Sequence, residues 1–82
     1  MLNTQEINNG LQIVKLNGQK FPTKGGYYKP DGYTLFHPQL GYFSFDSDYP
    51  YIPSGGRKAL KSILEAGGMT DYDNCKWLQT IQ

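Results

Sequence analysis

The chain of 82 residues has one cysteine, Cys75, and one histidine, His37. A lone cysteine cannot form an internal disulfide, whereas small secreted domains usually carry several, so we expect a cytoplasmic protein. One cysteine and one histidine cannot supply the ligands of a zinc site, and no motif supports Cys75 and His37 as a catalytic pair. The sequence therefore predicts a protein that is not an enzyme and that has no metal and no cofactor.

Long apolar runs are also missing, which predicts that no segment crosses a membrane. No basic start is followed by an apolar run, so we expect no signal peptide. The formal net charge of +1 is far below that of a typical duplex-binding protein. With 38% hydrophobic and 15% aromatic residues, the chain has enough apolar material to fold as one domain over residues 1–82.

Helical patterns occur at two places in the chain. Residues 1–10 are polar, and we expect either a flexible arm or one helical turn that Thr4 caps and Ile7 anchors. A longer helix is predicted at about 55–66, with Ser54 as its N-cap. This helix has an apolar stripe at helical spacing, formed by Leu60, Ile63 and Leu64. Two glycines, Gly67 and Gly68, should end it.

The clearest turn signal in the chain is Asn17–Gly18, which is typical of a two-residue hairpin turn. Closing that turn would place Lys15 opposite Lys20 in two short strands. Like charges in opposite positions repel each other, so these lysines should face solvent or an anionic partner. Residues 23–32 contain three glycines and a proline, and we expect a loop there.

A second hairpin is predicted within residues 33–45, with Pro38 and Gly41 in a loop of about four residues. The resulting register pairs Phe36 with Phe43, and places Thr34 and Phe45 beside them on the core face. A slip of one residue would exchange the two faces. The face predicted to lie away from the core carries Tyr33, Leu35, His37, Tyr42 and Ser44.

The last part of the chain predicts a strand in which Cys75 and Trp77 share one face and Leu78 takes the other. We expect this strand to join the sheet. The predicted fold class is therefore α+β, with a small antiparallel sheet of two hairpins plus a C-terminal strand. One α-helix, about 55–66, packs on one face of that sheet.

A single helix can cover only one face of such a sheet, so tyrosines on the other face should be partly exposed. The lysines of the first half of the chain lie near them in sequence, with no acidic residue between Glu6 and Asp31. Exposed tyrosines beside lysines are typical of surfaces that bind proteins or single-stranded nucleic acid. The predicted partner-binding residues are Tyr33, Tyr42, His37, Lys15, Lys20, Tyr27 and Tyr28.

The start of the longer helix is a candidate anion-binding site. Its free N–H groups, the close approach that glycine permits and two cations would all favour a phosphate or carboxylate. The alternative is a turn with solvated cations. The residues of this candidate are Ser54, Gly55, Gly56, Arg57 and Lys58.

Two Asp-x-Asp pairs are candidates for binding a divalent cation. They are Asp46 with Asp48 and Asp71 with Asp73. Neither pair has the spacing of a calcium-binding loop, so the sequence predicts no metal site.

These features favour a non-enzymatic protein-binding module. In size and profile the chain resembles small products of phages and mobile elements, among them the anti-CRISPR proteins. That resemblance implies an inhibitor that docks onto a host protein or protein complex, such as a nucleic-acid-binding one, and occludes a site. The alternative is a protein that binds single-stranded nucleic acid or a phosphate ligand. A third hypothesis is that the chain forms a homodimer.

Overall fold

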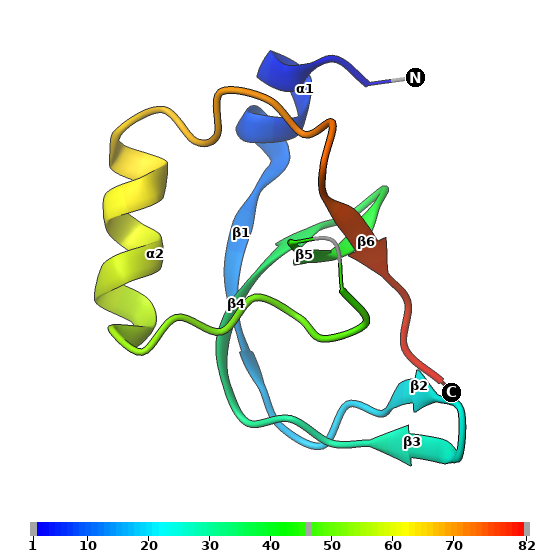
Figure 1. Ribbon diagram of the computed structural model, residues 1–82. Coiled ribbons are helices and arrows are strands. Elements are labelled where there is room, and N and C mark those ends of the chain that lie inside the picture. The colour runs from blue at the N-terminus through cyan, green and yellow to red at the C-terminus, as the bar shows by residue number, and fades with distance from the viewer. Residues whose placement is uncertain (1, 46, 82) are drawn as a thin grey trace.

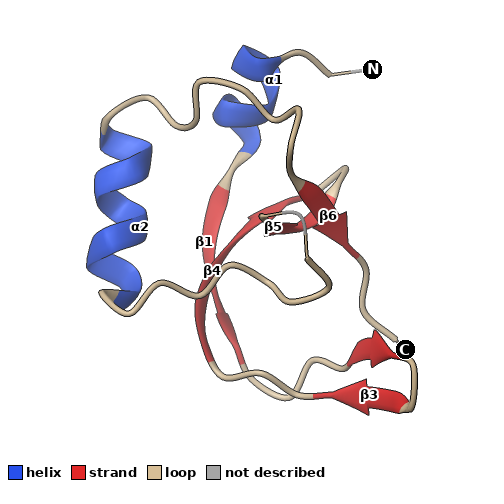
Figure 2. Cartoon of the chain, viewed as in Figure 1, coloured by secondary structure: helices blue, strands red, loops and turns tan. Residues whose placement is uncertain are grey.

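The computed structural model describes residues 2–45 and 47–81 and has an α+β fold, as predicted (Figure 1). The main sheet has four antiparallel strands in the order β1-β4-β5-β6, and a separate two-stranded sheet pairs β2 with β3. Figure 2 shows α2 beside the main sheet, α1 above the start of β1 and the β2–β3 hairpin at the far end from α1. The elements are α1 (Thr4–Gly10), β1 (Gln12–Leu16), β2 (Phe21–Thr23), β3 (Gly26–Tyr28), β4 (Gly32–His37), β5 (Gly41–Ser44), α2 (Gly56–Glu65) and β6 (Lys76–Leu78).

Helix α1 is the helical alternative for the first ten residues, but its cap is Asn3 and not Thr4. The Asn3 side chain accepts a hydrogen bond from the Glu6 N–H at 2.8 Å, and the Glu6 carboxylate accepts one from the Asn3 N–H at 3.1 Å. This reciprocal capping box satisfies two N–H groups that a helix start leaves free. Ile7 is buried in the core, as predicted.

Helix α2 keeps its predicted stripe and its predicted end. Leu60 is fully buried, and Ile63 and Leu64 pack against the core. Gly67 and Gly68 have positive φ angles of 97° and 89°, and the Gly68 N–H donates to the Ile63 carbonyl at 2.9 Å. These bonds form the left-handed stop that glycine allows at a helix C-terminus.

The predicted N-cap of α2 is wrong. The cap residue is Gly55, which has no side chain to accept a hydrogen bond, and Ser54 is exposed in the preceding turn. The Gly56 N–H donates to the Pro53 carbonyl at 3.0 Å, so a backbone turn satisfies the donor at this point. The helix therefore begins two residues after the serine.

The hairpin predicted at Asn17–Gly18 does not form. Strand β1 pairs with β4 instead, which places Lys15 opposite Tyr33 and not opposite Lys20. In this arrangement all five residues of β1 are paired, and Lys15 does not lie opposite a like charge. Gly18 still has a positive φ of 90°, but its bend leads the chain into a different hairpin.

The prediction of a loop over residues 23–32 is also wrong for its first part. Strands β2 and β3 pair there around a turn at Lys24–Gly25. Phe21 lies opposite Tyr28 in this small hairpin. The Phe21 side chain is fully buried and meets the Tyr42 ring at 5.2 Å between centroids. The second face of the main sheet is therefore covered in part by Phe21, contrary to the expectation of a bare face.

The second predicted hairpin forms with a register one residue away from the prediction. Phe36 pairs with Tyr42 and His37 with Gly41, so three residues form the loop. The Leu40 N–H donates to the His37 carbonyl at 3.2 Å, and Gly41 follows with φ of 116°. Three-residue hairpin loops commonly end on a positive-φ residue, which favours this closure over the predicted one.

This register exchanges the two faces of β4 relative to the prediction, whereas Phe43 of β5 stays on the core face, as predicted. The face toward the helices carries Leu35 and Phe43, whereas the opposite face carries Phe36 and Tyr42. Phe45, predicted for the core, is exposed. The core cluster consists of Ile7, Leu11, Leu35, Phe43 and Leu60, and Trp77 on the predicted C-terminal strand pairs with Phe43.

We expect Gly41→Ala to lower the free energy of unfolding by about 1–3 kcal/mol, because a side chain is strained at this φ. A Cβ at position 41 would also lie 2.5 Å from the Leu78 carbonyl oxygen in β6. Gly25→Ala is the matched control, since nothing lies within 4 Å of a Cβ there. Equal urea denaturation midpoints for the two variants would contradict the role assigned to Gly41.

Candidate docking surface

The β2–β3 hairpin is fixed to the rest of the protein by its inner face. Phe21 and Tyr28 form that face and stack on each other at 5.7 Å between ring centroids. Tyr28 continues the contact to Tyr49 at 4.8 Å. Aromatic contacts of this kind stabilise by about 0.5–1.5 kcal/mol each beyond their buried area, so the inner face is an anchor.

Within residues 2–45 and 47–81, the side chains of the outer face of the same hairpin do not pack against the core cluster. Side chains alternate along a strand, so Pro22 and Tyr27 point away from Phe21 and Tyr28. Tyr27 is 54% exposed and Ile81 is 43% exposed. We define the outer hairpin face as Lys20, Pro22, Tyr27, Lys29 and Ile81.

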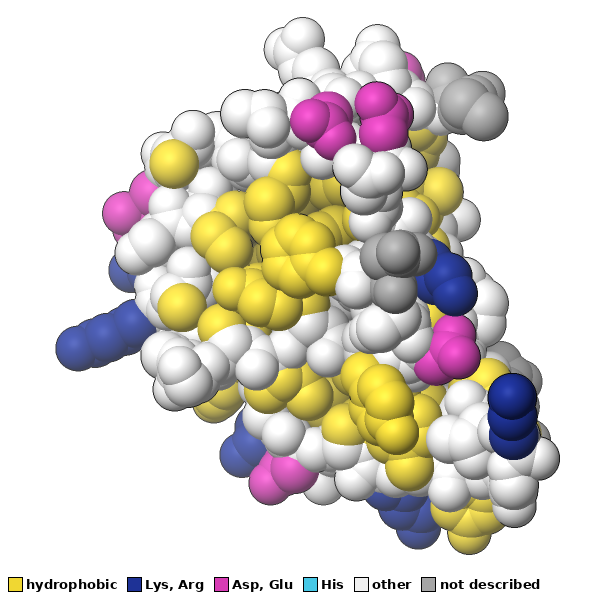
Figure 3. All heavy atoms as spheres, in the orientation of Figure 1, with side chains coloured by type: hydrophobic (Ala, Val, Ile, Leu, Met, Phe, Trp, Pro, Cys, Tyr) yellow, Lys and Arg dark blue, Asp and Glu magenta, His cyan; other side chains and the backbone are white. Residues whose placement is uncertain are grey.

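Ile81 joins this face through a single bridge. It lies opposite Lys20, and its N–H donates to the Lys20 carbonyl at 2.8 Å. The Lys20 ammonium lies 4.9 Å from the centroid of the Tyr27 ring, which is within cation–π range. Figure 3 shows basic and hydrophobic side chains side by side at the end of the molecule where β2 and β3 lie.

The hairpin concentrates positive charge. Lys20 and Lys29 belong to the outer hairpin face, and Lys24 occupies the turn between the strands. The ion pairs among residues 2–45 and 47–81 are Lys61–Glu65 and Lys76–Asp48, so none of the three hairpin lysines is paired there. The outer hairpin face is therefore apolar at its centre and basic at its rim.

Tyr28 links the hairpin to the 47–49 segment. Its hydroxyl donates a hydrogen bond to the Asp48 carbonyl. Burial, followed by the neighbouring Tyr49 and Asp48, raises the pKa of Tyr28 to about 12. The hydroxyl therefore keeps its proton, and its role as a donor, throughout the neutral range.

The structure brings three of the predicted partner-binding residues together on the hairpin: Lys20, Tyr27 and Tyr28. Tyr28 points inward and acts as an anchor. Tyr42 lies under the hairpin, half-buried against Phe21. These four residues belong to one end of the molecule.

The other three predicted partner-binding residues lie elsewhere. Lys15 and Tyr33 pair on the face toward the helices, with the Lys15 ammonium 5.9 Å from the Tyr33 ring centroid. Tyr33 and Tyr42 are therefore on opposite faces, contrary to the prediction. His37 is only 4% exposed, so its prediction as an exposed turn residue is wrong. The register shift explains both errors, because it turns Tyr33 and His37 toward the helices.

The predicted anion-binding turn is present as an exposed segment before and within the first turn of α2. Arg57 and Lys58 are exposed, and neither belongs to an ion pair among the described residues. Ser54 offers no cap to the helix. Binding of an anion at this turn stays a prediction.

Sequence reasoning missed Pro22, Lys29 and Ile81 as members of the candidate docking surface. The hairpin had a local signal, since Lys24–Gly25 separates two short β-prone stretches. Ile81 had none, because its partner Lys20 lies far away in the sequence.

No family model matches the chain, and no curated protein or solved structure is significantly similar to it. Within residues 2–45 and 47–81, no helix is both long and apolar enough to cross a bilayer. The described residues also contain no group of three or more potential metal-ligating side chains. Asp46, from one of the Asp-x-Asp pairs, lies outside the described residues.

We expect Tyr28→Phe to lower the free energy of unfolding by about 0.5–1.5 kcal/mol at neutral pH, because the bond to Asp48 is lost. The wild type should lose stability as the pH rises from 10.0 toward about 12, since Tyr28 holds its proton more tightly folded than unfolded. The variant should show a smaller loss, because Tyr72 and Cys75, whose pKa values burial also raises, are still present. Urea denaturation against pH tests this, with Tyr27→Phe as control, and identical profiles would contradict the assignment.

Proposed function

We propose that the protein is a non-enzymatic protein-binding module that docks through the outer hairpin face. The observation that carries this proposal is an exposed apolar centre of Pro22, Tyr27 and Ile81 within a lysine rim. An apolar centre with a polar rim is the usual organisation of a protein interface. The core does not need these side chains, so their exposure is consistent with a binding role.

The chemistry of this face favours a partner with an apolar depression surrounded by carboxylates. Tyr27 would act as the anchor, because tyrosine combines a large rigid area with a polar end and is enriched among the residues that dominate binding. Lys20 and Lys29 would meet acidic groups at the rim and accelerate the encounter. The lysine over the Tyr27 ring also restricts the ring before binding.

A finer hypothesis is a small phage or mobile-element protein that inhibits a host complex by occlusion, in the manner of anti-CRISPR proteins. The charge of the outer hairpin face sets a condition on that hypothesis. A lysine-rimmed face fits an acidic site and would be repelled by a basic nucleic-acid groove. We therefore infer that such an inhibitor would cover an acidic protein-contact site of its target.

We expect Tyr27→Ala to weaken binding to the purified partner by about 30-fold, equivalent to about 2 kcal/mol. The partner is first isolated from nuclease-treated lysate of the native host and then purified for affinity measurements. Lys29→Ala should lower the association rate, whereas the matched control Lys61→Ala on α2 should not. Wild-type affinity for Tyr27→Ala would overturn the assignment of the docking face.

Single-stranded nucleic acid is the second candidate partner, and the Lys20–Tyr27 contact favours it. An exposed ring beside an ammonium group can stack on a base while the lysine meets a phosphate.

We expect the two candidates to differ in their response to salt. Binding to a fluorescent oligo-dT should fall with a log–log slope of about −0.7 per phosphate contacted, whereas docking on a protein should weaken much less. No binding to oligo-dT at low salt would exclude this second candidate. Sedimentation at two concentrations tests whether a second copy of the chain is the partner.

A further inference from the structure

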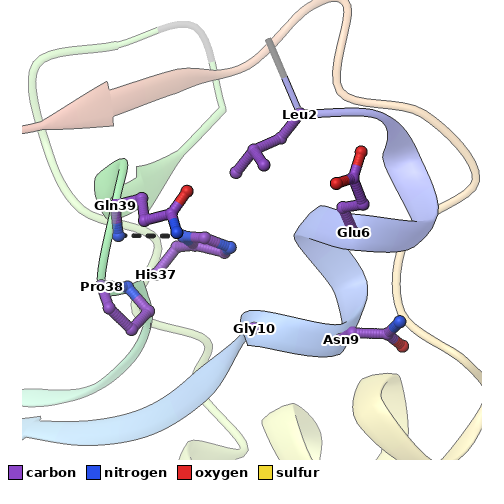
Figure 4. A pocket seen from close by; sticks show the side chains of 7 residues that line it. All are labelled: Leu2, Glu6, Asn9, Gly10, His37, Pro38 and Gln39. Carbon is purple, nitrogen blue, oxygen red and sulfur yellow. Dashed lines mark hydrogen bonds between the residues drawn. The ribbon is translucent and has the colours of Figure 1, made fainter.

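A second feature lies at the opposite end of the molecule from the hairpin. A cavity of about 370 Å³ opens between α1 and the turn that follows β4 (Figure 4). This volume is at the lower end of the range of small-molecule sites. The lining residues are Leu2, Glu6, Asn9, Gly10, His37, Pro38 and Gln39.

His37 presents a hydrogen-bond donor to this cavity. Its Nδ1 accepts a hydrogen bond from the Gln39 N–H at 3.1 Å, so the proton of the neutral ring is on Nε2. No group among residues 2–45 and 47–81 accepts a hydrogen bond from Nε2. His37 is only 4% exposed, but the buried side-chain atom without a partner among the described residues is Thr34 Oγ1 and not His37 Nε2. The Nε2 edge of the ring is therefore open to the cavity that His37 lines.

Gly10 makes room for the ring. A Cβ on Gly10 would lie 2.4 Å from the His37 Nε2 and 2.8 Å from its Cδ2, closer than atoms can approach. Any other residue at position 10 would push the imidazole out of its place. The sequence therefore keeps the edge of the ring that carries Nε2 against α1.

Glu6 brings a carboxylate to the same cavity. Its Oε1 accepts the Asn3 N–H of the capping box, and Oε2 has no partner among the described residues. In Figure 4 the side chains of Leu2, Glu6 and His37 border the same space, whereas Asn9 points away from them. Glu6 is the charged residue of the lining, so the cavity attracts cations and repels anions.

We propose that this cavity binds a primary ammonium group with its neighbouring carbonyl, the chemistry of an amino-acid amide or a peptide N-terminus. The ammonium group meets the Glu6 Oε2, and the carbonyl oxygen accepts the His37 Nε2–H. An apolar side chain of the ligand lies against Leu2 and Pro38. The charge-assisted bond to Glu6 supplies most of the selectivity, because an ammonium ion leaves water only for such a partner.

Leucine amide is the probe, and backbone amide NMR shifts of Gly10 and Gln39 are the readout. We expect saturable shifts at these two residues in the full-length protein. N-acetyl-leucine amide, which lacks the ammonium group, and isopentylamine, which lacks the carbonyl, should each bind at least about tenfold more weakly. Equal binding of the acetylated probe, or no shifts at concentrations that fill a millimolar site, would overturn the proposal.

Glu6→Gln is the matched variant, because glutamine also completes a capping box and leaves α1 intact. We expect Glu6→Gln to weaken binding of leucine amide by about tenfold relative to the wild type. The variant should bind isopentylamine no more tightly than the wild type does. Unchanged affinity would overturn the role of Glu6. Leu2→Ala tests the apolar wall and should reduce binding of leucine amide more than that of glycine amide.

Two further measurements separate the sources of the ligand and check the donor. Tighter binding of a Leu-Gly-Gly amide than of leucine amide identifies a peptide terminus, and equal binding identifies a single amino-acid unit. A long-range nitrogen–proton spectrum should show His37 protonated at Nε2 and not at Nδ1, and the reverse tautomer would contradict the proposal. The cavity does not include the hairpin, so these outcomes are independent of the proposed docking function.

Discussion

The pairing of Phe36 with Tyr42 across the β4–β5 turn is the constraint on which the arrangement of this protein depends. Period-two alternation means that a shift of one residue would move every side chain of β5 to the other face. The observed register places Phe43 among the rings of Phe45, Tyr51, Tyr72 and Trp77. It also turns His37 inward and leaves Tyr42 to receive Phe21, so one turn positions both the cavity and the hairpin anchor.

The helical side of the protein depends on Asn8, which joins α1 to the segment that follows α2. Its side chain accepts the Met69 N–H at 3.1 Å and donates to the Met69 carbonyl at 2.9 Å. Tyr72 adds a hydroxyl bond to the same Asn8 oxygen. Because these bonds connect distant parts of the sequence, they fix the wall of the cavity that α1 supplies. Among the described residues the hairpin end has no such polar connection to the helices. Aromatic packing, the Tyr28–Asp48 bond and the Ile81–Lys20 bond hold it instead.

The sequence predicted those features that local patterns determine. The stripe of Leu60 and its neighbours, the Gly67–Gly68 stop and the strand around Trp77 all follow from spacing within a few residues. The choice of β4 as the partner of β1 and the Lys20–Ile81 bridge depend on contacts between distant segments, which no turn signal encodes. The candidate docking surface was therefore only partly predictable: Lys20 and Tyr27 were recognised, but Pro22, Lys29 and Ile81 were not.

The separation of anchor and outer face within one hairpin determines which of its positions tolerate substitution. Phe21 and Tyr28 are constrained by the rings beneath them, whereas Pro22, Tyr27 and Lys24 meet solvent. Mutations at the outward positions change what the protein presents without disturbing the fold. These outward positions can therefore accept many different side chains while the anchor residues beneath them stay the same.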